Sequence, residues 1–110
     1  MKNMKIIFCI VCCLSLFACH QTNTTSFVAT VLENEESTLM VEADEGEDER
    51  KSSDVFVVTV SDAKLVDPNG NELTIHDISP NAKVEIVYDG VIAESYPAQI
   101  HQCSKVVVLE

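Results

Sequence analysis

Alternating apolar and polar residues dominate the chain beyond residue 25 and predict short β-strands. Residues 82–88 give the clearest example, with valine, isoleucine and tyrosine on one face and lysine and glutamate on the other. Residues 26–32 follow the same period, and residues 55–60 are rich in β-branched side chains and apolar on both faces. An alternating strand has one face against a core, whereas a strand apolar on both faces is typically covered on two sides.

Shorter β-prone runs and turn signals complete this pattern. The runs lie at residues 38–41, 63–66, 72–75, 95–100 and 105–109. Asp-Pro-Asn-Gly at 67–70 and Asp-Gly at 89–90 favour tight turns. One short helical turn is predicted at 76–79, and no longer segment has a helical period. Five principal strands and one helical turn predict a mainly β fold, a small five-stranded OB-like β-barrel that is closed or nearly closed.

The N-terminal segment has the features of a bacterial lipoprotein signal peptide. Lys2 and Lys5 precede a largely apolar run at 6–17, which is shorter than the roughly 20 residues of a spanning helix. Leu-Phe-Ala-Cys at 16–19 resembles a lipobox, which implies that Cys19 carries a lipid and becomes the mature N-terminus. The alternative is an ordinary signal peptide that releases a soluble protein. We expect a signal peptide at 1–18, the lipidated cysteine and a polar tether at 19–25, and one domain at 26–110, outside the cytoplasmic membrane.

The chain is strongly acidic, with 7 basic and 18 acidic side chains and a net charge of −11. Loss of Lys2 and Lys5 with the signal would leave five basic side chains against 18 acidic ones, a net charge of −13. Nucleic acids and anionic lipid headgroups require a basic surface, so we expect neither as a ligand. Of five cysteines only Cys19 and Cys103 would remain. Lipidation of the first leaves the second without a disulfide partner, and we expect it to be buried.

Several stretches of the C-terminal part resemble a known family. These stretches lie at 60–64, 69–70, 77–78, 84–90 and 94–100, and the last, Glu-Ser-Tyr-Pro-Ala-Gln-Ile, is the most specific. They are similar to the YobA-like small lipoproteins of Gram-positive bacteria, a family of unknown function. Asn81 and Ala82 depart from the family, which usually has Gly-Asp before the fourth strand. The resemblance implies a lipobox and a short OB-type barrel, and brings no activity, cofactor or catalytic residue.

The acidic segment 42–49 is one candidate for a binding site. Six of its eight residues are acidic, and hard cations such as Ca²⁺ bind six to eight oxygen atoms. The weak metal-ligand candidates are Asp44, Glu45, Glu47 and Asp48. The segment lacks the spacing of an EF-hand loop, and like charges in a run usually remain in solvent. A solvated loop between two strands is therefore the expected structure, with no metal.

A second set of candidates lies near the C-terminus. Tyr96 and Gln99 could rim a ligand groove, although the Tyr96–Pro97 pair could equally serve an architectural turn with a cis bond. His101 and Cys103 lie two apart, so on a strand they would share a face and could begin a metal site. Too few further ligands are near in the sequence, and the expected alternative is a surface histidine beside a buried cysteine.

No motif of a nucleophilic or phosphate-binding enzyme is present in the sequence. We therefore expect a non-enzymatic, monomeric module without a cofactor, attached to the membrane through the lipid on Cys19. Its partner would be an envelope protein or a glycan. A cation-binding envelope protein that uses the acidic segment is the first alternative, and a small hydrolase is the second.

Overall fold

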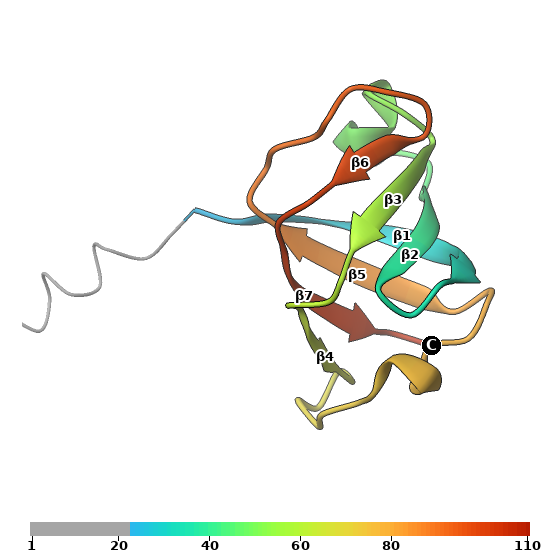
Figure 1. Ribbon diagram of the computed structural model, residues 1–110, viewed down its shortest axis with the longest axis vertical. Helices are drawn as coiled ribbons and strands as arrows, with labels where there is room; N and C mark the ends of the chain where they lie inside the picture. Colours follow the sequence, from blue (N-terminus) through green and yellow to red (C-terminus); the bar gives the residue numbers. More distant parts are fainter. Residues whose placement is uncertain (1–22) are drawn as a thin grey trace, which may run out of the picture.

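A computed structural model describes residues 23–110 as one β structure with almost no helix (Figure 1). It contains seven strands and two 3₁₀ turns. The strands are β1 (Thr25–Asn34), β2 (Thr38–Ala43), β3 (Val55–Thr59), β4 (Lys64–Val66), β5 (Lys83–Tyr88), β6 (Ala98–Ile100) and β7 (Cys103–Val108). The 3₁₀ turns are η1 (Asp48–Lys51) and η2 (Ile75–Asp77). The predicted signal peptide and Cys19 lie outside the described residues, and those that are described include no helix long and apolar enough to cross a membrane.

The seven strands form one mixed sheet in the order β4-β7-β5-β1-β2-β3-β6. β3 pairs with β6 and β4 pairs with β7 in parallel, and the other four ladders are antiparallel. Figure 1 shows β6 and β3 at the top of the molecule and β7 and β4 at the bottom. The sheet order is therefore open, with β4 and β6 as its two edge strands.

The prediction of a five-stranded barrel, closed or nearly closed, is wrong in its strand count, and the sheet is not closed. The last two expected runs are the separate strands β6 and β7, with His101 and Gln102 between them. β6 pairs with β3, whereas β7 pairs with β5 and β4. Residues 63–66 add the short strand β4, whereas residues 72–75 contribute only a bridge from Glu72 to Val66. The helical turn predicted at 76–79 is present as η2, which ends at Asp77, two residues earlier than predicted. The mainly β class is confirmed.

The turns predicted from the sequence are present. Gly70 and Gly90 have φ angles of +89° and +88°, which L side chains rarely adopt. Asp67 accepts hydrogen bonds from the backbone of Asn69 and from Asn71, and these bonds lower the pKa of its carboxyl group. Asn81 also adopts a positive φ, +76°, so it makes the turn before β5 without a glycine.

The hydrophobic core lies between the curled halves of the sheet and contains the inward-facing residues of the strands. β5 alternates strictly, with Val84, Ile86 and Tyr88 buried and their neighbours half-buried. Phe27 packs against Phe56 with ring centroids 5.3 Å apart and meets Tyr88 edge-on at 5.7 Å. Such tilted and edge-on contacts are the favoured geometries of aromatic pairs, so these three rings form the centre of the core.

Each edge strand makes one isolated bridge to a neighbouring loop. Ala93 and Gln99 exchange two backbone hydrogen bonds of 2.8 and 3.1 Å along β6. Along β4, Leu73 donates to Leu65 over 2.8 Å, next to the bridge between Val66 and Glu72. These bridges occupy part of each edge and so reduce strand addition by other chains.

Candidate functional site

The outer face of β2, β3 and β6 brings the two candidates Tyr96 and Gln99 next to apolar side chains. Cross-strand pairing places Glu33, Met40, Val57 and Gln99 in one row across β1, β2, β3 and β6. These residues alternate with buried ones, so their side chains point away from the core. Hereafter, "outer face" denotes this row and its neighbours on the same side. The members of the outer face are Leu32, Glu33, Met40, Glu42, Val55, Val57, Tyr96 and Gln99.

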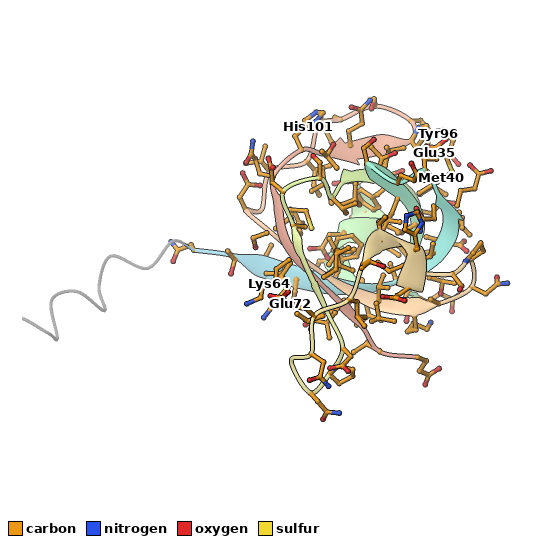
Figure 2. All side chains as sticks on the ribbon, turned by 60° about the horizontal axis from the view of Figure 1, so that its bottom comes forward. Glu35, Met40, Lys64, Glu72, Tyr96 and His101 are labelled. Atoms are coloured by element: carbon orange, nitrogen blue, oxygen red, sulfur yellow. The ribbon has the colours of Figure 1, made fainter. Side chains whose placement is uncertain are left out.

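Tyr96 is the most exposed large apolar residue of the described chain. Its exposed fraction is 76%, and it lies two residues before β6, joined to Pro97 by a cis peptide bond as the sequence suggested. Gln99 is exposed in the middle of β6. Figure 2 shows Tyr96, Glu35 and Met40 on the same side of the molecule. Neither Tyr96 nor Gln99 lines the three best-formed clefts of the described surface. The outer face is therefore a broad surface, and the ligand groove at these residues stays a prediction.

A β-bulge explains the exposure of Leu32. The pairing of β1 with β2 shifts by one residue between Val31 and Glu33, so Leu32 is the extra residue on β1. The bulge leaves Leu32 38% exposed beside Glu33. Sequence reasoning did not identify Leu32 or Met40 as members of a surface, because their exposure depends on the strand register.

The acidic segment connects β2 to β3 as a loop, as expected, but three of its carboxylates bond to groups of the sheet. We call residues 44–51 the acidic cap. The backbone of Asp44 donates to the carbonyl of Val28 over 2.9 Å, and the carboxylate of Glu47 accepts a hydrogen bond from the backbone N–H of Val28. β2 ends at Ala43, so Glu47 replaces the strand partner that Val28 would otherwise lack. A carboxylate in this position satisfies a backbone donor that is costly to leave unpaired.

Two further contacts fasten the acidic cap. Lys83 of β5 donates to both carboxylate oxygens of Asp44 at 3.0 and 3.1 Å. The hydroxyl of Tyr88 donates to Glu49 over 2.8 Å. Burial raises the pKa of Tyr88 well above its usual value, and the hydrogen bond and negative charge of Glu49 add to this effect. The tyrosine hydroxyl therefore remains protonated and keeps its bond to Glu49.

The metal-ligand candidates are separated by these contacts. Asp44 and Glu47 point to protein donors, whereas Glu45 and Asp48 are exposed. Within residues 23–110 no group of three or more histidine, cysteine or acidic side chains could hold a metal ion. His101 is exposed between β6 and β7 while Cys103 is buried. Cation binding by this segment stays a prediction.

Cys103 is a buried thiol at the start of β7, as the sequence predicted. Its exposed fraction is 6%, and its Sγ donates to the carbonyl oxygen of Lys105 over 3.4 Å. Burial raises the pKa of the thiol to about 11. It borders an open cleft of about 410 Å³, together with Asp62, Asp89 and Ser104. The reactive form of a cysteine is the thiolate, so this geometry lowers the reactivity of Cys103 near neutral pH.

We expect alkylation of Cys103 by iodoacetamide at pH 8 to be about 100-fold slower in the folded chain than in urea, since its thiol pKa is about 11 rather than 9.0. The fold favours the neutral thiol over the thiolate. The contribution of Cys103 to the free energy of unfolding is therefore present below pH 9 and is lost as the pH rises toward 11. Mass spectrometry of the peptide that contains Cys103 measures the rate. Equal rates in buffer and urea would contradict the buried thiol.

One of three comparisons with known proteins found a match. A family model described as a protein of unknown function, DUF3221, matches residues 27–110. The matched region begins within β1 and includes the outer face and the acidic cap. The search of curated proteins and the search of solved structures each returned no match.

Proposed function

We propose that this chain, which belongs to the DUF3221 family, is a lipid-anchored, non-enzymatic binding or accessory module of the cell envelope. In this proposal the lipid on Cys19 holds the protein at the extracytoplasmic side of the membrane. The domain then presents its outer face to an envelope protein or a glycan. The YobA-like name and the OB-type arrangement belong to the same proposal.

The observation that carries the binding function is the exposed aromatic ring of Tyr96 on a sheet face with further apolar side chains. Tyrosine is enriched among the residues that dominate binding energy at interfaces. Met40, Val55 and Val57 lie half-buried on neighbouring strands of this face, and Leu32 is exposed at its margin. Apolar residues that gather on one face of a soluble domain indicate an interaction surface.

The strand pairing supports an OB-type arrangement. β1, β2 and β3 are consecutive antiparallel neighbours, and β1 also pairs with β5. Residues 98–108 pair with β3 through β6 and with β5 through β7, so one nearly continuous segment contacts both halves of the sheet. OB folds bind ligands on the face of their second and third strands, which here is the outer face.

Lipid attachment is tested by metabolic labelling with an alkyne palmitate analogue in cells that produce the chain. We expect the label to be incorporated and the protein to sediment with membranes, and we expect Cys19→Ala to lose both properties. Two acyl chains on one cysteine hold a protein stably on a bilayer, so the lipidated chain should stay with the membrane fraction. A labelled Cys19→Ala protein, or wild-type protein free in the medium, would contradict the anchor.

The binding surface is tested by placing a photo-cross-linking residue at position 99 of the full chain in intact cells. We expect a discrete cross-linked product, because Gln99 is exposed on the outer face beside Val57. The matched control carries the same residue at position 69, in the exposed turn between β4 and η2. No product at position 99, or an identical product at position 69, would contradict a binding function of the outer face.

A further inference from the structure

We infer that the outer face docks a basic protein segment that carries apolar or aromatic side chains between its positive charges. This inference rests on the proposed function and specifies its partner. It follows from the distribution of charge over the sheet, from the exposed ring of Tyr96 and from the scarcity of other stacking rings.

Charge is distributed unevenly over the sheet. β1, β2, β3 and β6 contain no lysine or arginine, whereas Lys64 and Lys105 lie side by side on β4 and β7. Figure 2 shows Lys64 on the side of the molecule opposite Tyr96, Glu35 and Met40. The half of the sheet with the outer face is therefore the one without basic residues on its strands.

Acidic side chains lie beside the apolar residues of the outer face at the β1–β2 end. Glu33 lies directly beside Met40 in the strand register, and Glu35 and Glu36 follow in the β1–β2 turn. All three are exposed, and among the described residues no lysine, arginine or histidine lies within 4.0 Å of Glu33. Glu42, by contrast, has Arg50 at 3.9 Å. A partner with positive charges would meet the carboxylate of Glu33 and the turn while its apolar side chains cover the row.

Tyr96 adds a second form of recognition for a cationic partner. The face of an exposed tyrosine ring attracts lysine and arginine side chains through its quadrupole. The other phenylalanine and tyrosine rings of the described chain, Phe27, Phe56 and Tyr88, are buried. A glycan that binds by stacking would find one ring only, and an anionic polymer would be repelled by the negative charge of the face. The geometry therefore favours a basic protein segment.

The test uses the full lipidated chain in phosphatidylcholine vesicles and three fluorescent probes. The probes are a peptide that alternates lysine and phenylalanine, a peptide that alternates glutamate and phenylalanine, and a neutral oligomer of N-acetylglucosamine. We expect only the lysine peptide to bind, with an affinity that falls as salt is added. Tyr96→Ala should weaken this binding about tenfold, since exposed tyrosine rings are enriched among the residues that dominate binding energy at interfaces. Val91→Ala is the matched control, because Val91 is 65% exposed in the same loop but outside the outer face.

Matched charge variants separate local recognition from general attraction to an acidic protein. Glu33→Gln combined with Glu36→Gln should weaken binding of the lysine peptide about fivefold. Asp62→Asn combined with Glu72→Gln makes the same change in net charge near β4 and should have an effect of less than about twofold. Equal effects of the two pairs, or equal binding of the glutamate peptide, would overturn the inference. If only the sugar oligomer bound, and its binding depended on Tyr96, the inference of a basic partner would be overturned but the proposed binding function would remain. The cross-linking at position 99 tests that proposed function separately.

Discussion

Phe27→Ala is expected to lower the free energy of unfolding by about 3–5 kcal/mol. The ring of Phe27 is 1% exposed and lies between Phe56 and Tyr88, at centroid distances of 5.3 and 5.7 Å. Alanine would remove the apolar contacts of both neighbours and leave a cavity that the surrounding strands could fill only partly. Domains of this size are stable by about 5–15 kcal/mol, so the variant should be largely unfolded or unfold at much lower urea concentration.

A matched control for this prediction is Tyr96→Ala, which also removes an aromatic side chain but from the exposed outer face. We expect its unfolding free energy to lie within about 0.5 kcal/mol of the wild-type value. Urea denaturation of both variants, followed by far-UV circular dichroism, gives the comparison. A Phe27→Ala protein as stable as Tyr96→Ala would show that the three-ring centre of the core is described incorrectly.

Glu47→Ala is expected to cost about 1–3 kcal/mol, although Glu47 belongs to an acidic run in which loss of a charge would ordinarily relieve repulsion. The reason is its carboxylate, which accepts the hydrogen bond of the Val28 backbone N–H beyond the end of β2. Alanine would leave this donor without its partner. A cost of this size should lower the melting temperature by several degrees, about 4–8 °C for each kcal/mol in a domain of this length.

Two variants distinguish the hydrogen bond from the charge. Glu47→Gln keeps a side-chain oxygen that can accept from Val28, so it should retain much of the stability lost in Glu47→Ala. Glu45→Ala removes a neighbouring exposed carboxylate and should change the unfolding free energy by no more than about 0.5 kcal/mol. A Glu47→Ala protein that is more stable than wild type would mean that the segment is a repelling loop rather than a cap on the sheet.

Local patterns predicted much of the fold correctly. The alternation at residues 82–88 identified β5 and its buried face, and the glycine-containing turns at 67–70 and 89–90 are present. These features depend on neighbours in sequence, where side-chain period and backbone conformation act directly. The runs at 95–100 and 105–109 predicted two separate segments, but the pairing of β6 with β3 and of β7 with β5 depends on distant strands, and no local pattern reports it.

The candidate site was predicted less completely for the same reason. The sequence singled out Tyr96 and Gln99, and both are exposed, the first two residues before β6 and the second in its middle. Met40 and Leu32 joined them only through the register of β2 with β3 and the bulge in β1. The charge pattern of the acidic segment predicted a loop in solvent. In the structure Glu47, Glu49 and Asp44 each form a hydrogen bond with a specific group of the sheet. Those partners, Val28, Tyr88 and Lys83, lie 19 to 39 residues away.

Hydroxyl-radical footprinting of Tyr96 in intact cells, compared with the purified chain, tests most directly whether the outer face is a binding surface. A bound partner would cover the ring, so the account predicts that Tyr96 is oxidised several-fold more slowly in cells than in isolation. Val91, exposed in the same loop but outside the outer face, should be oxidised at the same relative rate in both samples. Equal oxidation of Tyr96 in cells and in the purified protein would contradict the account.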